Sequence, residues 1–272
     1  MMNFQIDDNH RLEGKVTHLE CSKNTKKFQQ LPSSIILHYT AGRDALSSAK
    51  YLCKENIKAS AHLVIGRKGE VIQLVPFNTI SWHAGKSSYK GRNGFNNFSI
   101  GIEIDNAGPL EPIGQSYSAW FGKKYPATAV VKATHRNEKV ERYWHNYTEK
   151  QIDTVEKICE LLLATYPSIK EILGHEEISP GRKQDPGPAF PLDNLRSRLT
   201  EERDSEEAFT AMKAEVSVPL LNIREMPSIQ AEKVMEPLPE GTRLKILGER
   251  DGWLKVRTQV EGWVASDYVD IV

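Results

Sequence analysis

A loop in the second half of the chain carries a histidine and an aspartate that could bind a metal ion together. His175 and Asp185 stand ten residues apart in the segment Gly174–Pro188, and Lys183 precedes the aspartate by two residues. The segment is rich in Pro and Gly, which predicts a rigid, irregular loop that aims its side chains. A neutral imidazole and a carboxylate are natural zinc ligands, but a catalytic zinc site also needs a third protein ligand and an open position.

His38 is the predicted third ligand. It lies near the end of an apolar, β-branched run, Ser34–Thr40, which predicts a short buried strand. A histidine in such a place is more often structural than a ligand when it stands alone. Its combination with the Gly174–Pro188 loop favours a zinc site of the His, His, Asp type, in which bound water has its pKa lowered toward about 7.

Zinc hydrolysis also needs a group that accepts a proton, and Glu103 is the candidate. It lies in the predicted strand Ser99–Asp105, where Ile102 and Ile104 share one face and Glu103 projects from the other. Spacing alone leaves two interpretations equally open, a catalytic carboxylate and an exposed strand residue. Lys183 could place a positive charge beside an oxyanion, an interaction worth about 3–4 kcal/mol per donor, although a loop lysine taken alone is usually solvated surface.

The elements that must position these residues alternate between strand and helix. Apolar spacing predicts a helix over Ala45–Lys54 with Asp44 as its N-cap, and a second helix from the capping box of Thr148 and Gln151 to the residue before Pro167. A hairpin is predicted between these helices, from Ala61–Gly66 and Glu70–Val75 around a turn that ends in Gly69. The pattern indicates an α/β domain in which helices flank a mixed central sheet.

Two further segments differ in character from this domain. Residues 108–147 are rich in aromatic and polar residues and are interpreted as a long insertion that lies near the site. Residues 201–215 are predicted to be a charged linker between a first domain (1–200) and a second (216–272). The second domain has short stretches of alternating hydrophobicity, such as Trp253–Arg257, separated by turn signals, and is predicted to be a small all-β barrel.

Composition excludes several classes of function. The 272 residues are 39% hydrophobic and carry no net charge, and no segment approaches the roughly 18 apolar residues of a membrane span. The sequence lacks a dense Lys/Arg run with interleaved aromatic residues, which argues against a nucleic-acid partner. The first residues show no Sec-type signal peptide, so synthesis in the cytoplasm is expected. The three cysteines lack metal-type spacing and are predicted to be buried or idle thiols.

The first domain resembles the zinc-dependent N-acetylmuramoyl-L-alanine amidases of type 2, a superfamily that includes the peptidoglycan recognition proteins. The resemblance covers residues 30–195 and rests on four motifs in the family's order: His38-Tyr39-Thr40, Ser81-Trp82-His83-Ala84-Gly85, Ile100-Gly101-Ile102-Glu103-Ile104 and the Gly174–Pro188 loop. The insertion at 108–147 departs from the compact members, which puts the breadth of substrates in doubt.

The resemblance implies a set of site residues and an activity. It places Zn²⁺ on His38, His175 and Asp185, and it puts Glu103 and Lys183 at the family's catalytic positions. The implied reaction is cleavage of the amide between N-acetylmuramic acid and L-alanine of the stem peptide, so peptidoglycan or muropeptides are the expected partner. Substrate contacts are expected from four further residues, Tyr39, Trp82, His83 and Asn106.

The second domain resembles bacterial SH3 domains over most of residues 216–272. In cell-wall enzymes such modules usually bind peptidoglycan, which raises the local concentration of the enzyme on a polymeric substrate. Trp253, Trp263 and Tyr268 are candidate ligand contacts, and for the two tryptophans a packing role is at least as well supported.

Two alternatives remain open at the level of sequence. One is a non-catalytic peptidoglycan receptor on the same fold, which the three filled ligand positions disfavour. The other is an amidase that recycles soluble anhydro-muropeptides in the cytosol, as opposed to one that acts on the cell wall after lysis or non-Sec export. The SH3-like domain favours the polymeric wall, and the sequence does not determine the oligomeric state.

Overall fold

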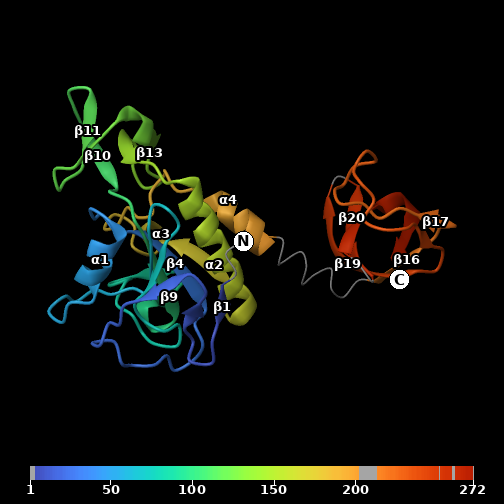
Figure 1. Ribbon diagram of the computed structural model, residues 1–272, viewed down its shortest axis with the longest axis horizontal. Helices are drawn as coiled ribbons and strands as arrows, with labels where there is room; N and C mark the ends of the chain where they lie inside the picture. The colour runs from blue at the N-terminus through green and yellow to red at the C-terminus, as the bar shows by residue number, and fades with distance from the viewer. Residues whose placement is uncertain (1–3, 202–212, 251, 259–260, 272) are drawn as a thin grey trace. The chain divides into compact units, whose positions relative to one another are not determined.

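The computed structural model describes residues 4–201, 213–250, 252–258 and 261–271, which fall into two compact units. The first runs from Met1 to Leu195 and the second from Arg196 to Val272 (Figure 1). Most of the predicted charged linker, residues 202–212, lies outside the described residues. None of the described helices is both long and apolar enough to cross a membrane.

The first unit is built on a six-stranded mixed sheet in the order β15-β4-β9-β5-β6-β3. Every neighbouring pair is parallel except β5 and β6, which form the predicted hairpin. The strands are β3 (Val16–His18), β4 (Ser34–Tyr39), β5 (Leu63–Ile65), β6 (Val71–Gln73), β9 (Ser99–Ile104) and β15 (Glu171–Gly174). The predicted α/β fold with a mixed central sheet is confirmed.

Two helices lie on either side of β4 and β9 (Figure 1). Helix α1 (Ala45–Leu52) begins where the Asp44 side chain accepts a hydrogen bond from the Ser47 amide, as the sequence predicts. Helix α2 (Glu149–Thr165) begins at the predicted capping box, in which Thr148 and Gln151 each bind the other's backbone. Both helices bury an apolar stripe against the sheet, and α1 packs beside β5 and β6.

The insertion predicted over 108–147 forms a second sheet. Its five strands are antiparallel in the order β12-β11-β10-β14-β13. They are β10 (Pro109–Ile113), β11 (Ser116–Ser118), β12 (Lys124–Tyr125), β13 (Val130–Thr134) and β14 (Glu141–His145), drawn in green in Figure 1. A small apolar cluster that includes Leu110, Ala119 and Tyr125 holds the sheet together, so the insertion is an ordered element.

Short elements complete the first unit. They are β1 (Gln5–Ile6), β2 (Leu12–Glu13), β7 (Ser88–Tyr89), β8 (Arg92–Asn93), the 3₁₀ turns Phe95–Asn97 and Ala127–Ala129, and α3 (His175–Ile178). Helix α4 (Leu192–Arg196) contains the boundary between the units, and a π-helical turn at Ser197–Glu201 follows it in the second unit. The start of α3 directly after β15 brings His175 to the end of the central sheet.

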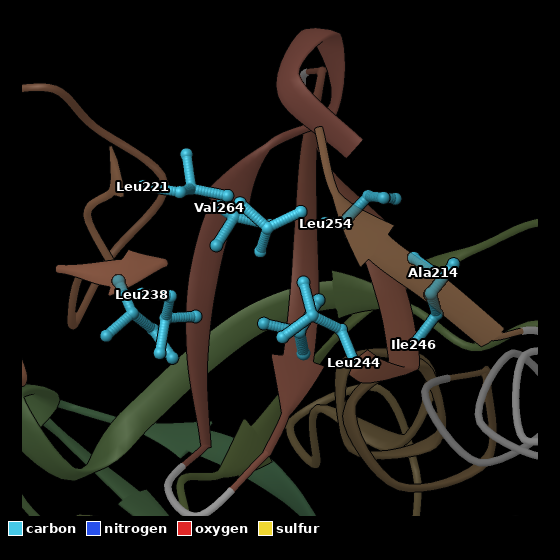
Figure 2. Packing of buried hydrophobic residues seen from close by; sticks show 10 residues of the cluster. Ala214, Leu221, Leu238, Leu244, Ile246, Leu254 and Val264 are labelled. Atoms are coloured by element: carbon cyan, nitrogen blue, oxygen red, sulfur yellow. The ribbon is translucent and has the colours of Figure 1, made fainter. Parts of the chain in front are cut away.

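The second unit contains a five-stranded sheet in the order β21-β20-β19-β16-β22, with a separate strand pair. Its strands are β16 (Lys213–Val216), β17 (Leu220–Leu221), β18 (Leu238–Pro239), β19 (Arg243–Arg250), β20 (Trp253–Arg257), β21 (Glu261–Ala265) and β22 (Val269–Ile271), with a 3₁₀ turn at Ser266–Tyr268. Figure 2 shows Leu244, Leu254 and Val264 gathered in its apolar core. The expectation of a small all-β second domain is confirmed.

The prediction of idle thiols is wrong for two of the three cysteines. Cys21 and Cys53 form a disulfide, with their Cα atoms 4.6 Å apart, whereas Cys159 is a free, buried cysteine. Cys53 is the residue that caps the C-terminus of α1, and Cys21 belongs to the segment that follows β3. The pairing depends on the fold because 32 residues separate the two cysteines along the chain.

Candidate metal centre and its cleft

Three side chains converge at the ends of the parallel strands. His38 comes from β4, His175 from the first position after β15, and Asp185 from the loop beyond α3. The Nδ1 atoms of His38 and His175 lie 2.9 Å apart, and each lies 2.8 Å from Oδ2 of Asp185. All three residues are buried, and among the described residues they form the one cluster of His, Cys, Asp or Glu that could hold a metal ion.

A hydrogen-bond chain behind His38 fixes which of its two ring nitrogens carries the proton. His83 Nε2 lies 3.3 Å from the backbone carbonyl of Ser99, and His83 Nδ1 lies 3.0 Å from His38 Nε2. A carbonyl can only accept, so His83 carries its proton on Nε2 and accepts a hydrogen bond at Nδ1. His38 must then donate from Nε2, which leaves the lone pair of its Nδ1 directed at the cluster.

The same reasoning orients His175. Its Nε2 lies 3.0 Å from the carbonyl oxygen of Ala84 and 3.3 Å from Arg182 Nη2, and the Arg182 group also donates to that carbonyl at 2.9 Å. The shorter contact, with an atom that can only accept, assigns the proton to Nε2 and leaves a lone pair on Nδ1. Two imidazole lone pairs and a carboxylate oxygen therefore face one another with no proton to share. Such a donor set is suited to a cation, and its spacing of 2.8–2.9 Å is within about half an ångström of that between tetrahedral zinc ligands.

The electrostatics of the cluster match this arrangement. Burial and the neighbouring His175 lower the pKa of His38 to about 4, so the imidazole is neutral at physiological pH. Burial alone would raise the pKa of Asp185, but the two imidazoles beside it bring that pKa below its ordinary range. A neutral His38 and an ionised Asp185 are the protonation states that metal ligation requires.

Glu103 lies next to His38 on the sheet. Strands β4 and β9 pair in parallel with His38 opposite Glu103, which places the two side chains on the same face. Oε2 of Glu103 is buried and has no hydrogen-bond partner within the described part of the chain. Burial, followed by the charge of Asp185, raises the pKa of Glu103 well above its ordinary value, and Lys183 partly offsets this. A buried carboxylate with a free acceptor is suited to holding and releasing a proton.

Gly101 makes room for the histidine behind His38. It precedes Glu103 by two residues on β9 and therefore faces the same side of the sheet. A Cβ atom at this position would lie 2.3 Å from Cγ of His83, far inside van der Waals contact. The absence of a side chain lets the His83 ring pack against the strand and reach His38.

The insertion braces the loop that carries two of the three converging residues. Glu176 is buried, with Oε2 2.7 Å from His135 Nε2 and Oε1 3.0 Å from Arg136 Nε. The amide of Glu176 donates to the carbonyl of Asp185 at 2.9 Å, and the amide of Gly187 donates to Glu176 Oε2 at 3.2 Å. Sequence reasoning missed Glu176 and His135, because one carboxylate beside His175 gives no signal until a partner 41 residues away is brought to it.

A cavity of about 440 Å³ opens onto the cluster and is lined by eight of the nine predicted site residues. They are His38, Tyr39, Trp82, His83, Glu103, His175, Lys183 and Asp185. His83 reaches this cavity but is only 8% exposed, and both of its ring nitrogens are engaged within the protein, Nδ1 with His38 and Nε2 with Ser99.

The structure does not bring Asn106 into the site. Asn106 is 1% exposed, and its Nδ2 donates to the carbonyls of His145 and Asn146 while its Oδ1 accepts from the Gly108 amide. The side chain therefore joins the start of the insertion to its end and has no donor left for a substrate.

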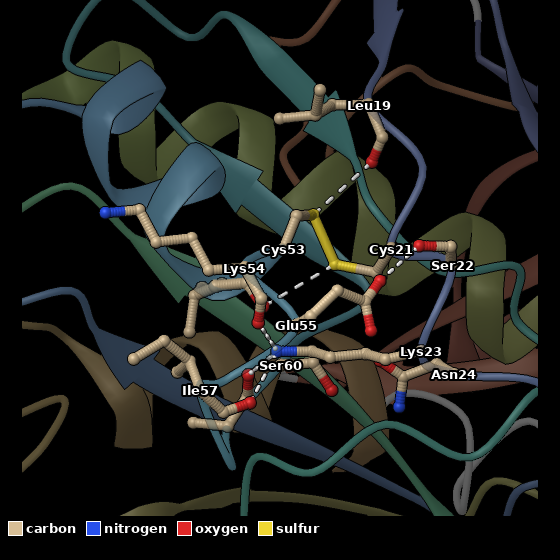
Figure 3. The surroundings of a disulfide bond; sticks show 12 residues. Leu19, Cys21, Ser22, Lys23, Asn24, Cys53, Lys54, Glu55, Ile57 and Ser60 are labelled. Carbon is tan, nitrogen blue, oxygen red and sulfur yellow. Dashed lines mark hydrogen bonds between the residues drawn. A yellow bond between two sulfur atoms is a disulfide. The ribbon is translucent and has the colours of Figure 1, made fainter.

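A lysine and the disulfide tie together the segment that forms one wall of the cavity. Figure 3 shows Lys23 beside the bond between Cys21 and Cys53. Lys23 Nζ donates to the backbone carbonyls of Lys54, Ile57 and Ala59 at 2.9, 2.6 and 3.0 Å. The same Nζ lies 5.9 Å from the ring centroid of Trp82, which is 39% exposed. Because Ala59 and Trp82 line the cavity, the clamp around Lys23 and the neighbouring disulfide hold this wall in place.

The sequence was also compared with known protein families. Residues 28–188 match the family described as N-acetylmuramoyl-L-alanine amidase, type 2, which is more than half of the chain. The chain belongs to this amidase family. Residues 219–270 match the bacterial SH3 domain, so both resemblances inferred from the sequence are confirmed.

Individual amidases are similar to the first unit. The 1,6-anhydro-N-acetylmuramyl-L-alanine amidase AmpD of Salmonella typhimurium is 34% identical over 143 residues, which are 52% of this chain and 58% of that protein. The N-acetylmuramoyl-L-alanine amidase AmiD of Escherichia coli is 31% identical over 169 residues, covering 59% and 51%. A crystal structure of an AmpD derivative superposes with a TM-score of 0.52 at 25% identity, covering 72% of this chain and 99% of that one. The chain spans 51 to 63% of the length of the curated relatives that it matches.

The SH3-like unit has a groove of its own. A hollow of about 260 Å³ is lined by Trp253, Tyr268, Arg224 and neighbouring apolar residues. Trp253 is half-buried and Tyr268 is 49% exposed, so both candidate contacts reach the same groove. The side chain of Trp263 lies outside the described residues.

Proposed function

We propose that this protein is a zinc-dependent amidase that cleaves the bond between N-acetylmuramic acid and L-alanine of the peptidoglycan stem peptide. The observation that carries the proposal is the convergence of His38, His175 and Asp185, with matched tautomers, in a cavity that also holds Glu103 and Lys183. The names of the relatives AmpD and AmiD support this substrate class. The division into a catalytic domain (1–200), a linker (201–215) and a wall-binding domain (216–272) is part of the proposal.

The three converging residues would hold the zinc, which when bound supplies Lewis-acid polarisation of the amide carbonyl and lowers the pKa of water. Glu103 accepts the proton of the attacking water, because its buried Oε2 has no competing partner among the described residues. It then delivers that proton to the amine of L-alanine as the C–N bond breaks. Lys183 lines the same cavity and places its positive charge where the oxyanion forms.

A pair of variants tests the assignment. Glu103→Gln keeps the shape of the side chain, and we expect it to retain zinc at one ion per chain while it releases no stem peptide from muropeptides, as measured by mass spectrometry. His175→Ala should lose zinc and activity together because it removes one of the three ligands. Near-normal cleavage by Glu103→Gln, or full zinc occupancy in His175→Ala, would contradict the assigned roles.

A receptor without catalysis is the alternative from another class. It would retain muropeptide without releasing free stem peptide in the same digestion. The complete donor set and the orphan carboxylate of Glu103 favour the enzyme, because a receptor has no use for an acceptor buried without a partner.

The setting that we propose is the cell wall. The disulfide between Cys21 and Cys53 favours an oxidising compartment over the cytosol, and the bacterial SH3 domain favours a polymeric substrate. Activity should therefore be higher on intact sacculi than on soluble anhydro-muropeptide, and deletion of residues 216–272 should reduce the first without changing the second. The opposite preference would favour recycling of soluble fragments.

A further inference from the structure

A second hollow adjoins the proposed catalytic cavity and is lined in part by the insertion. It has a volume of about 350 Å³ and shares five lining residues with the catalytic cavity, including Thr40, Tyr51 and Glu103. The insertion contributes one lining residue to this hollow, Trp120, which is 78% exposed and does not line the catalytic cavity. A substrate whose scissile bond lies beside Glu103 can therefore extend without interruption into this second hollow.

The exposed tryptophan is held in place by contacts at its base. Trp120 Nε1 donates to the carbonyl of Ala41 at 2.9 Å. The adjacent Phe121 gives its carbonyl to Arg43 at 2.9 Å, and the Arg43 guanidinium lies 5.4 Å from the centroid of the Phe121 ring. These contacts join the turn between β11 and β12 to the loop between β4 and α1. They hold a large, exposed aromatic surface at the edge of the second hollow, where a ligand bound in the hollow can contact it.

The two sides of the site differ in charge. The second hollow is lined by aromatic rings and by hydroxyl-bearing residues such as Ser47 and Ser48, and Glu103 is the one ionisable carboxylate on it. The lining of the catalytic cavity includes Arg182 and Lys183, neither of which lines the second hollow. The two substituents of the scissile amide differ in the same way, because one is an uncharged pyranose and the other is a peptide that carries carboxylates.

We infer that the second hollow is the subsite for the muramoyl sugar and that Trp120 is its stacking platform, with the stem peptide directed toward Arg182. This inference rests on the proposed amidase function. The flat apolar face of a pyranose suits an aromatic ring, and the hydroxyl groups around it suit Ser and Thr side chains. Trp120 acts here as a specificity-determining residue, since it would contact the sugar and not the reacting atoms.

Two probes that contain the same scissile amide, one with and one without the sugar ring, measure how much the sugar contributes to substrate binding. The first is N-acetylmuramoyl-L-alanyl-D-isoglutamine, and the second is the lactoyl-L-alanyl-D-isoglutamine that lacks the sugar ring. We expect the wild-type protein to have a KM at least tenfold lower for the first probe. Trp120→Ala should remove most of that difference by raising KM for the muramoyl probe alone, with kcat changed less than threefold.

Matched variants control for damage to the insertion. Ile113→Ala removes another exposed apolar side chain from the same sheet, and it lines neither hollow, so its KM values should equal those of the wild type. Trp120→Phe keeps an aromatic face and should retain part of the preference for the sugar. An unchanged ratio of the two KM values in Trp120→Ala would overturn the subsite.

Calorimetric binding of both probes to the Glu103→Gln protein separates the two proposals. Tighter binding of the muramoyl probe that depends on Trp120 supports the subsite even if the wild type cleaves neither probe, a result that would refute the amidase function alone. Cleavage of both probes with no effect of Trp120→Ala on binding or KM would leave the amidase function standing and refute the subsite.

Discussion

Gly101→Ala tests whether the packing behind His38 sets the strength of the metal site. The new Cβ would lie 2.3 Å from Cγ of His83 and 2.6 Å from its Cδ2 and Nδ1. Ordinary contacts start near 3.4 Å, so the ring has to retreat by roughly 1 Å, and overpacking of this kind costs about 1–3 kcal/mol. The same shift would lengthen the 3.0 Å contact between His83 Nδ1 and His38 Nε2 beyond hydrogen-bonding distance.

Two measurements follow from this geometry. Denaturant unfolding of the metal-free protein should show Gly101→Ala to be less stable by about 1–3 kcal/mol. Competition with a chelator should show zinc affinity lowered about 10- to 100-fold, the usual effect of losing the partner that orients a ligating histidine. Both effects should appear without any change to the three residues that we propose as metal ligands.

A double-mutant cycle with His83→Ala tests whether the clash with the His83 ring causes the stability loss in Gly101→Ala. Once the ring is gone, Gly101→Ala meets no obstacle and should change stability by less than about 0.5 kcal/mol, which gives a coupling energy of about 1–3 kcal/mol. If Gly101→Ala costs the same in both backgrounds, then His83 is not what excludes a side chain from position 101, and the reasoning is refuted.

Three further predictions concern the cleft and the stability of the catalytic unit. Lys183→Met should lower kcat on muropeptide by about 10²- to 10³-fold with zinc retained; a change below threefold would remove Lys183 from the oxyanion role. Cys21→Ser should destabilise the first unit by about 3–4 kcal/mol, because the crosslink to Cys53 spans 32 residues; an unfolding midpoint that neither the mutation nor a reductant shifts would contradict this. Burial raises the pKa of Asp105 to about 6 from 3.8, so the folded state binds its proton more tightly than the unfolded state does. The ionised Asp105 therefore lowers the free energy of unfolding above pH 6, and this destabilisation disappears as the pH falls toward 4. Asp105→Asn should therefore be more stable than the wild type by about 2–3 kcal/mol at pH 7 and equally stable near pH 4, and a stability difference that is the same at both pH values would argue against it.

Local patterns predicted the elements of the catalytic unit well, because each signal lies within a few residues. The Thr148 capping box, the Asp44 N-cap and the hairpin around Gly69 all depend on contacts between near neighbours in the chain. Residues 108–147 gave no such signal, because their strands are short and are stabilised by pairing with one another and by a small shared core. The sequence could thus indicate an insertion there but could not predict its sheet.

The disulfide contradicts the prediction of idle thiols, and the burial of Asn106 is a second feature that the sequence did not indicate. The thiols of Cys21 and Cys53 meet because the end of α1 packs beside the segment after β3, which no spacing rule predicts. Asn106 lies three residues after Glu103, but the chain turns into the insertion there and buries the amide group between the carbonyls of His145 and Asn146.

The sequence by itself determined the identities of the reactive groups, since residue types and motif order were sufficient to nominate His38, His175, Asp185, Glu103 and Lys183. Tertiary structure decided what those groups can do. The parallel register of β4 and β9 put Glu103 beside His38, and the hydrogen bonds from His38 to His83 and from His175 to the Ala84 carbonyl decided which nitrogens carry the protons. The physical reason is that a ligand's tautomer and an acid's pKa depend on burial and on partners distant in sequence, and only the folded chain brings those partners into contact.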